Sequence, residues 1–469
     1  MDIAKLQKAI EGKVYEDEET LKEVETDFGR IVRRTPKALV VPASPQDVQN
    51  VVKIAAQEGW SVSVRGSAHS QGGQSLSEGG ILIDLSSLDR VESIDAESAL
   101  VQAGVLLRDL VRETHEKGLI PCVLTDSLDV TVGGALSTAG FGAASHRHGT
   151  LSSQVEELEV VTGEGHLVRC SPTENEDLFQ CSRCGFGQFS IIVKARIRLR
   201  RSAPRVRTYF LLYDNLETLM RDQRKILRGE RFNHVESWCA PCSQGMRKLG
   251  DIKIPFAEWF YPMHVSLEYG DDAPPGPESL AGLSFYRQVH TEDSTLLEFL
   301  SRNDAVVSLW KQTGTWNLSH PWMEALLPWD QAAAYVRGVL KSVPPNLLIG
   351  GLVSLWPCRS SSSDSPLLKR PDGDSMIGFG ILPAVSRQFL PVSLALLRTA
   401  SDLCTQIGGK RYLSGWLDFD YTRWKQHYGD TWEKVLQWKT FYDPSGILNP
   451  GFIQFSEPAP DLEPDGEIG

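Results

Sequence analysis

The sequence predicts a two-domain α+β protein, and three features of the chain support this class. Up to about residue 203, short apolar segments alternate with amphipathic stretches and glycine turns, as in an α/β arrangement. Past Pro204 the segments become longer, with more aromatic residues and fewer glycine turns, which indicates a second domain. The length of 469 residues is also enough for about two to four domains.

Apolar runs and capping residues predict the first elements. Residues 37–41 and 61–64 are short apolar strands. Between them, Ser44-Pro45 supplies an N-cap and a first-turn proline, and Gly59 ends a helix whose apolar residues recur at helical spacing. The same patterns predict further strands at 81–85, 99–103, 158–162, 166–170 and 190–199, and a helix at 106–118.

Two later segments are predicted to lack regular structure. The serine-rich segment 358–366 has the composition of a surface loop. Residues 456–469 contain five acidic residues, three prolines and no basic residue, so we expect a disordered acidic tail there.

Charge and composition exclude several classes of protein. The net charge of −12 repels phosphate backbones, and no basic stretch is dense enough to form a nucleic-acid groove. No apolar run approaches the roughly 18 residues of a membrane helix, and the first residues lack the apolar core of a signal peptide. Eight cysteines are too few for a disulfide framework. We therefore expect a cytoplasmic protein that binds neither nucleic acid nor a membrane.

A glycine-rich segment follows the predicted strand at 61–64. It reads Arg-Gly-Ser-Ala-His-Ser-Gln-Gly-Gly-Gln over residues 65–74. Small residues after a strand let backbone N–H groups close on an anion such as a pyrophosphate, because no side chain blocks the approach. His69, at the tip of this segment, would then face the ligand. By itself the pattern also fits an ordinary turn.

A second cluster of small residues spans positions 124–137 and includes Thr131, Gly133 and Ser137. Its small side chains and backbone amides suit a polar ligand. Asp126 lies near the start of this cluster, with apolar residues on one side and the small-residue turn on the other. Partial desolvation there would raise its basicity and allow it to act as a general base. The alternative interpretation is an aspartate that caps a helix or a turn.

Other sequence features indicate which cofactors to expect. The pairs Cys181/Cys184 and Cys239/Cys242 have the thiolate spacing of a zinc site. Their separation is much longer than in a zinc ribbon, so we expect ordinary thiols and no metal. The two Gly-Phe-Gly triplets lack the third glycine of a dinucleotide fingerprint, which argues against a nicotinamide cofactor.

Taken together and in this order, the motifs resemble those of the cytokinin dehydrogenases, flavoenzymes of the vanillyl-alcohol oxidase and p-cresol methylhydroxylase superfamily. The resemblance extends from Thr26 to Phe455. It rests on three blocks of motifs. The first comprises Thr125-Asp126, residues 131–137 and Arg147-His148-Gly149, and the second comprises Asp177-Leu178-Phe179 and residues 185–189. The third comprises His320-Pro321-Trp322, Arg411-Tyr412-Leu413 and residues 424–429. The resemblance implies a p-cresol methylhydroxylase-type FAD-binding fold. Its FAD domain would comprise residues 1–203 and 414–455, and residues 204–413 would form a substrate domain on an antiparallel sheet.

The resemblance also implies roles for individual residues. His69 matches the histidine that carries FAD covalently, and a neutral imidazole nitrogen is a competent nucleophile for that attachment. Asp126 matches the carboxylate that takes a hydrogen bond or a proton from the substrate amine, and Glu268 matches a second carboxylate at the substrate entrance. The positions that match the FAD lining are Gly66, Ser67, Ala68, His69, Ser70, Gln74, Asp126, Thr131, Ser137, Phe141, Ile192 and Tyr412.

The chain departs from the family pattern at several positions. Ala68 stands where the family has glycine, which requires a negative φ at this residue. Phe452 replaces an expected glutamine, and the segment that shapes the substrate pocket reads Leu355-Trp356-Pro357. The position that holds a cysteine in relatives with doubly attached flavin is Ser127 here, so we expect a single attachment.

The implied activity is oxidation of a secondary amine next to an allylic carbon. For a cytokinin such as N6-isopentenyladenine, hydride transfer to flavin N5 and hydrolysis would give adenine and an aldehyde. The partners would be this small-molecule substrate and an electron acceptor, for which oxygen and a quinone both remain open. The alternative is a superfamily oxidase that acts on a sugar, an alditol or a specialised-metabolite amine.

Overall fold

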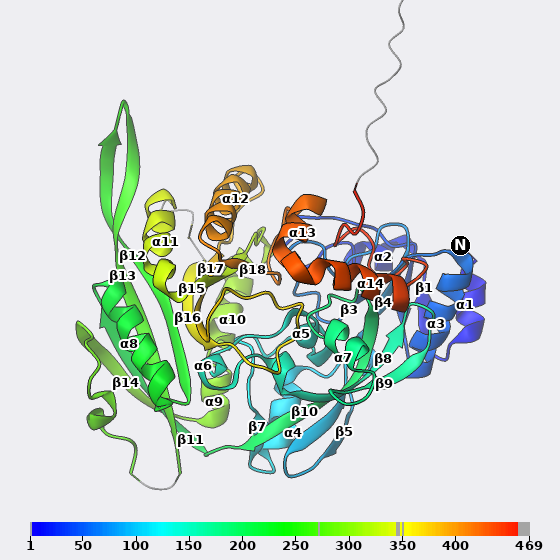
Figure 1. Cartoon of the computed structure of the whole chain (residues 1–469), viewed down its shortest axis with the longest axis horizontal. Coiled ribbons are helices and arrows are strands. Elements are labelled where there is room, and N and C mark those ends of the chain that lie inside the picture. Colours follow the sequence, from blue (N-terminus) through cyan, green and yellow to red (C-terminus); the bar gives the residue numbers. More distant parts are fainter. Residues whose placement is uncertain (1, 271–272, 344–347, 349–350, 458–469) are drawn as a thin grey trace, which may run out of the picture.

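The computed structural model describes residues 2–270, 273–343, 348 and 351–457 and shows a mixed α+β protein with three sheets (Figure 1). The predicted α+β class is therefore confirmed. The predicted disordered tail at 456–469 lies outside the described residues except for its first two positions.

The first sheet has four strands, in the order β1 (Lys13–Tyr15), β2 (Ala38–Val41), β4 (Ile81–Asp84) and β3 (Val62–Arg65). The last three strands are parallel, and helix α3 (Pro45–Glu58) connects β2 to β3. As predicted, the Ser44 side chain accepts a hydrogen bond from the Asp47 amide, and Gly59 ends the helix with a φ of +68°. Parallel strands place the segment after β3 at one edge of the sheet, and this segment is the glycine-rich loop.

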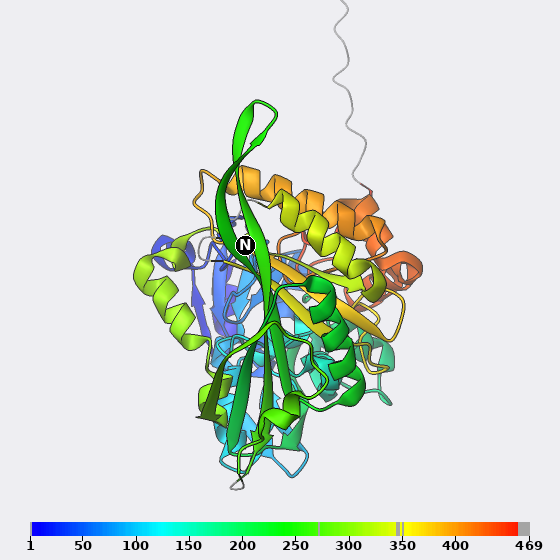
Figure 2. The same cartoon turned by 90° about the vertical axis from the view of Figure 1, so that its left-hand side faces the viewer.

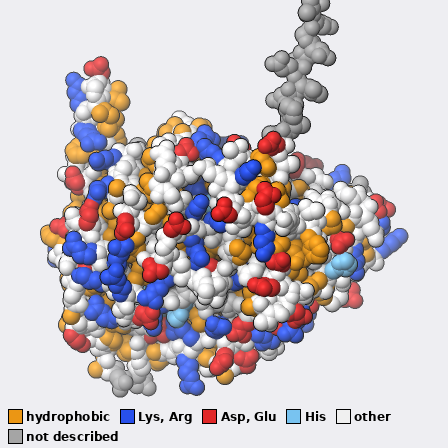
Figure 3. All heavy atoms as spheres, in the orientation of Figure 1, with side chains coloured by type: hydrophobic (Ala, Val, Ile, Leu, Met, Phe, Trp, Pro, Cys, Tyr) orange, Lys and Arg blue, Asp and Glu red, His pale blue; other side chains and the backbone are white. Residues whose placement is uncertain are grey.

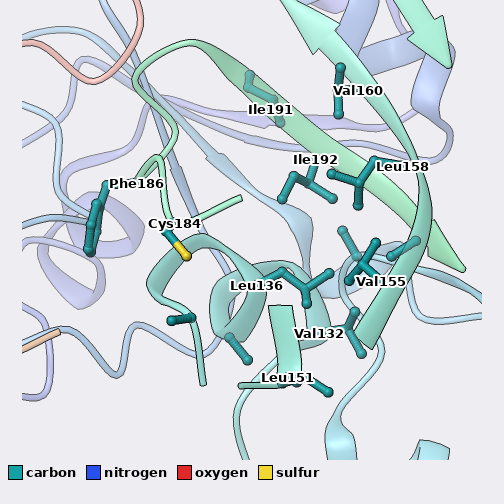
Figure 4. Close-up of a cluster of buried hydrophobic side chains, with 14 of the residues drawn as sticks. Val132, Leu136, Leu151, Val155, Leu158, Val160, Cys184, Phe186, Ile191 and Ile192 are labelled. Carbon is teal, nitrogen blue, oxygen red and sulfur yellow. The ribbon is translucent and has the colours of Figure 1, made fainter. Parts of the chain in front are cut away.

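The second sheet surrounds the longest strand of the N-terminal half. Its order is β5 (Val91–Ile94), β6 (Ser98–Gln102), β10 (Ser190–Arg201), β8 (Val155–Thr162) and β9 (Leu167–Cys170), and β7 (Leu119–Pro121) also pairs with β10. Figure 4 shows Ile192 and Leu158 of this sheet packed near Val132 and Leu136 of helix α5 (Val132–Thr138). This packing places the second small-residue cluster against a buried sheet.

The third sheet has eight strands and occupies the later part of the chain. Its order is β14 (Arg287–Thr295), β11 (Arg205–Tyr213), β13 (Ile252–Tyr269), β12 (His234–Leu249), β16 (Leu352–Arg359), β17 (Ser375–Leu382), β15 (Met323–Pro328) and β18 (Lys410–Tyr412). All its pairings are antiparallel.

The two faces of this third sheet pack against different partners. Along β15, Met323, Ala325 and Leu327 join the core that includes helices α8 (Leu216–Gly229), α11 (Trp329–Ser342) and α12 (Leu390–Gln406). The alternate residue Leu326, with Tyr412 of β18, joins the core of the N-terminal sheets instead. We call this second side the inner face. Alternation along a strand thus sets which side chains meet the glycine-rich loops.

After the third sheet, the chain returns to the N-terminal core. Helices α13 (Tyr421–Tyr428) and α14 (Trp432–Tyr442) precede a segment that lies beside β3, where the Val62 amide donates to Ile447 O over 2.8 Å. The Asn449 amide donates in turn to Val62 O over 2.7 Å. The return of the chain agrees with the predicted domain division, which stays a prediction.

The hairpin of β12 and β13 projects far beyond the rest of the molecule (Figure 2). We call its residues 240–260 the ribbon. β16 pairs with β12 only at residues 237–239, and β11 pairs with β13 only from Tyr261 onward, so the ribbon is two-stranded. Hydrophobic, basic and a few acidic side chains lie on its surface (Figure 3).

The remaining elements connect the sheets. They include α1 (Ile3–Ala9), α2 (Glu18–Glu23), α4 (Leu107–His115), α6 (Ser145–His148), α7 (Glu176–Ser182), α9 (Leu296–Leu300) and α10 (Asp304–Thr313). Among the helices of the described ranges, none is both long enough and apolar enough to cross a membrane.

The prediction of a surface loop at 358–366 is wrong in part. Residues 358–359 still belong to β16, and Ser365 is only 2% exposed. The buried guanidinium of Arg183 donates to Ser363 O over 2.7 Å, and Ser365 Oγ donates to Arg183 O over 3.0 Å. A serine-rich composition does not reveal that a segment is held by hydrogen bonds to a distant residue, here Arg183.

Candidate functional site

The glycine-rich loop between β3 and β4 carries His69 and presents a run of unused backbone donors. Within the described part of the chain, the amides of residues 67–71 donate no hydrogen bond to another protein group. Gly66 is needed for close packing, since a Cβ there would lie 2.1 Å from Thr131 Oγ1. Five consecutive free donors in a small-residue loop suit a pyrophosphate, so the residues present fit an FAD.

Asp27 organises this loop, and the sequence interpretation did not identify it. Its carboxylate is 4% exposed and accepts hydrogen bonds of 2.8 Å from Ser70 Oγ and from the Gly73 amide. Burial raises the pKa of Asp27 to about 6, which the hydrogen bonds only partly offset. Because it ties together two ends of the loop, we assign Asp27 a positioning role.

The expected negative φ at Ala68 is wrong. Ala68 has a φ of +50°, in the left-handed region, and is 8% exposed. Its carbonyl accepts a hydrogen bond of 2.9 Å from the Phe28 amide. This bond and the dense packing around the loop hold the residue in a conformation that an alanine Cβ disfavours.

In the second small-residue cluster, the amides of residues 132–135 at the start of α5 already donate to protein acceptors. The amide of Gly133 donates to Ala103 O over 2.8 Å, and that of Gly134 to Thr131 Oγ1 over 3.3 Å. Ser137 Oγ donates to Gly133 O over 2.8 Å. These contacts fix α5 on the second sheet, so the glycines of this cluster supply no free donors.

Aromatic residues surround His69. Its ring centroid lies 4.5 Å from that of Phe28 and 6.0 Å from that of Trp322, which directly precedes β15. Burial lowers the pKa of His69 to about 4, so its imidazole is neutral at pH 7. Phe28 in turn stacks on His320 at 4.2 Å. The histidine is therefore enclosed between the first loop and the beginning of β15.

Several predicted residues meet where the inner face of the third sheet contacts the core of the N-terminal sheets. Gln74 Nε2 donates over 2.8 Å to Gly415 O, two residues after the Tyr412-Leu413 pair. The Gly140 amide donates to Tyr412 Oη over 3.2 Å, and the ring of Phe141 lies 5.0 Å from that of Tyr412. Ile192 is 5% exposed within the core behind α5. The structure thus brings Gln74, Phe141 and Tyr412 together but leaves Ile192 in a hydrophobic cluster.

Asp126 shares a cation with a second carboxylate that the sequence interpretation missed. Its Oδ1 lies 3.7 Å from Nη2 of Arg302, whose Nε donates over 2.8 Å to Glu236 of β12. Although 65% of the Asp126 side chain is exposed, the dense surrounding protein raises its pKa to about 6, as does the nearby charge of Glu236. Arg302 opposes this shift. The two effects that raise the pKa of Asp126 thus outweigh the charge of Arg302.

Glu268 lies in a different environment. Its carboxylate is 5% exposed and accepts hydrogen bonds from Arg200 over 2.9 Å and from His234 Nε2 over 2.9 Å. Burial alone would raise the pKa of the Glu268 carboxyl, but the hydrogen bonds and charges of these two partners lower it. A cavity of about 20 Å³, lined by Arg200 and Arg302 among others, lies between the two ion-pair groups. The carboxylate that neighbours Asp126 is therefore Glu236, and Glu268 is held in a buried ion pair.

The cysteine pairs show no metal-binding geometry. All eight thiols are free, and Cys239 is buried whereas Cys242 is exposed. In the ranges that the structure describes, no group of three or more His, Cys, Asp or Glu residues could hold a metal ion. Burial raises the pKa of the Cys184 thiol to about 11, which keeps it protonated and unreactive.

Comparison with known proteins identifies the class. A family described as "FAD binding domain" matches residues 36–171, and one described as "Cytokinin dehydrogenase 1, FAD and cytokinin binding" matches residues 277–455. Cytokinin dehydrogenase 6 of Oryza sativa is 31% identical, over 96% of this chain and 93% of the relative. Cytokinin dehydrogenase 2 of Arabidopsis thaliana is 30% identical, over 91% and 90%. An uncharacterized oxidoreductase of the fasciation locus of Rhodococcoides fascians is 30% identical, over 93% and 98%.

The free amides of the first loop and these matches together define an FAD-dependent oxidoreductase. More particularly, the chain belongs to the cytokinin dehydrogenase family.

Proposed function

We propose that this protein oxidises cytokinins of the N6-isopentenyladenine type to adenine and an aldehyde. The observation that carries this proposal is Asp126, a carboxylate with a raised pKa beside the Arg302–Glu236 ion pair. The names of the relatives favour a cytokinin over a sugar or an alditol. We further propose the p-cresol methylhydroxylase-type arrangement, with residues 1–203 and 414–455 forming the FAD domain and 204–413 the substrate domain.

FAD would be held by the first loop, and when bound it supplies the acceptor for two electrons. The amides of residues 67–71 would bind its pyrophosphate. Gly66, Ser67, Ala68, Ser70, Gln74, Thr131, Ser137, Phe141, Ile192 and Tyr412 would complete the lining. We propose His69 as the point of covalent attachment, because its neutral imidazole has a free electron pair at pH 7.

Asp126 would orient the substrate by accepting a hydrogen bond from the exocyclic N–H, and it would take that proton as the carbon–nitrogen bond is oxidised. The imine product then adds water and separates into adenine and the aldehyde. Arg302 would keep Asp126 ionised in the resting enzyme and stabilise the position of its carboxylate. Glu236 is our candidate for the second carboxylate of the site. Glu268 is better placed to position Arg200 and His234.

The test is product analysis with N6-isopentenyladenine. The wild-type protein should release adenine, and Asp126→Asn should reduce turnover by roughly 10²–10⁴-fold. Parallel assays with oxygen and with a quinone will identify the electron acceptor. Absence of adenine from a flavin-loaded protein would refute cytokinin oxidation.

Covalent attachment has its own readout. After denaturation the flavin should remain with the wild-type chain but separate from His69→Ala. Flavin that separates from both proteins would refute attachment at His69.

A further inference from the structure

Glu324 of β15 is a carboxylate that the proposed chemistry does not use. It lies opposite Gly380 of β17 on one side and opposite Tyr412 of β18 on the other. Directly opposed residues of antiparallel strands share a face, so Glu324 belongs to the inner face of the third sheet. The same face contacts the core of the N-terminal sheets through Tyr412, which lies against Gly140 and Phe141.

Two glycines of β17 allow polar side chains of the neighbouring strand β16 to pack closely on the sheet near this carboxylate. A Cβ at Gly380 would lie 2.5 Å from Ser354 Oγ and 3.5 Å from Glu324 Cγ, so the glycine separates two polar side chains. A Cβ at Gly378 would lie 1.9 Å from the Trp356 ring, which crosses over that residue. A side chain at Gly380 would collide with Ser354 and crowd Glu324, and one at Gly378 would collide with Trp356.

Two polar atoms on these packed side chains have no hydrogen-bond partner among the described residues. Ser354 Oγ and Trp356 Nε1 are both buried and make no hydrogen bond to the described residues. Buried polar groups without partners cost free energy, and in native proteins they commonly mark a place where a ligand or water binds.

Glu324 is itself incompletely paired. Ser414 Oγ donates to its Oε2, but none of the ion pairs found in the described ranges includes Glu324. Arg411, whose positive charge acts on Glu324, donates from its guanidinium to Glu324 O, Ser401 Oγ and Trp416 O. One carboxylate oxygen thus remains available to accept a hydrogen bond.

We infer that Glu324 recognises the substrate, accepting a hydrogen bond from an N–H or O–H donor while Asp126 holds the amine that reacts. This inference rests on the proposed function. The electrostatic coupling of the two carboxylates agrees with it, because burial raises the pKa of Glu324 to about 7 and the charge of Asp126 adds to that shift. Ser414 and Arg411 act in the opposite direction. The site then binds its substrate at two separate carboxylates.

Two groups of a cytokinin could supply the donor, namely a hydroxyl on the side chain and the ring N9–H. Three substrates distinguish them: N6-isopentenyladenine, its counterpart with a terminal side-chain hydroxyl, and its 9-riboside, which lacks the N9–H. The variants are Glu324→Met, which removes the acceptor, and Glu324→Gln, which keeps one acceptor oxygen. Glu292→Gln, on the exposed strand β14, is the matched control.

We expect Glu324→Met to lower kcat/KM by about 10- to 100-fold only for substrates that carry the recognised donor. A loss confined to the hydroxylated substrate identifies the side chain. A loss for both free bases but not for the riboside identifies the ring. Glu324→Gln should keep part of the preference, and it provides the same ratios if Glu324→Met does not fold.

Equal losses for all three substrates, or no loss, would overturn the inference. Failure of the wild-type protein to oxidise any of them would instead refute the proposed function. In that event, calorimetric binding of the saturated analogues, which lack the allylic double bond, still reports whether Glu324 distinguishes the donors. Identical affinities for these analogues with and without the donor would also overturn the role of Glu324.

Discussion

Ala68 adopts a conformation that glycine prefers, one residue before the histidine that we expect to carry FAD. The left-handed region costs a non-glycine residue roughly 1 kcal/mol, and such strain persists only where neighbouring contacts hold the backbone. The Phe28 amide, which donates to Ala68 O over 2.9 Å, is one such contact.

Ala68→Gly should therefore stabilise the protein. We expect the free energy of unfolding to rise by up to about 1 kcal/mol, less the extra entropy that glycine gives the unfolded chain. Thermal unfolding of the protein with and without flavin measures the change. Ala144→Gly is the matched control, because Ala144 is 4% exposed but has a φ of −93° and should lose stability. A destabilised Ala68→Gly variant would contradict the strain argument.

The pH dependence of activity should follow the charges beside Asp126. A general base works when it is deprotonated, so kcat/KM should rise with pH through about 6 and then level off. Glu236→Gln removes a negative charge and should move the midpoint to lower pH, by about 0.5–1 unit. Arg302→Met removes a positive charge and should move it to higher pH. Two shifts of the same sign would contradict the assignment of Asp126 as the base.

Whether a site residue could be predicted depended on how far along the chain its contact partners lie. The loop at 65–74 and Asp126 were predicted because each lies within a local pattern of small and apolar residues. Glu236 and Arg302 were missed, since the ion pair that places them beside Asp126 joins three distant segments. The polar residues His234 and Glu236, followed by Trp238, occupy alternate positions of β12, which was a weak signal that they share one face of a strand.

At the scale of elements, local signals predicted the N-terminal half well. Ser44, Pro45 and Gly59 mark the ends of α3, and the predicted strands at 81–85 and 99–103 correspond to β4 and β6. The long hairpin of β12 and β13 could not be predicted in this way, because its ribbon has no buried face and therefore no strict alternation.

The exposed ribbon should contribute little to stability. Leu249 and Ile252 are 58% and 60% exposed, so replacing both with serine should change the free energy of unfolding by less than about 0.5 kcal/mol. Met263, on the same strand β13 but 0% exposed, is the control, and Met263→Ala should cost about 2–5 kcal/mol. Chemical denaturation measures both. A large loss from the ribbon variant would mean that these side chains have a partner in solution.

At the scale of the whole molecule, the last part of the described chain packs into the core of the N-terminal sheets. Asn449 is 3% exposed, and its Nδ2 donates to Gln74 O over 3.0 Å and to Phe186 O over 2.7 Å. A residue near the C-terminus thus joins the first glycine-rich loop to the turn before β10. Flavin binding and global stability are therefore linked through one buried amide.

Asn449→Ala should reduce both properties. Two carbonyls would lose their donor, which should cost about 1–3 kcal/mol of unfolding free energy and lower the flavin content of the purified protein. Thermal unfolding and the flavin absorbance per chain provide the readouts. Asn317→Ala is the control, because Asn317 is exposed and makes a side-chain bond of 3.3 Å with Arg30. Full flavin content in Asn449→Ala would show that flavin binding by the loop does not depend on the hydrogen bonds of the Asn449 side chain.

The ribbon also has a practical consequence for handling this enzyme. Its turn at Gly250-Asp251 lies at the far end of the ribbon, which projects beyond the rest of the molecule, far from strand β3 (Figure 1). A peptide tag or a surface linker inserted between these two residues would therefore project away from the reacting groups. The hairpin offers a natural site for immobilising the protein on a solid support in a defined orientation.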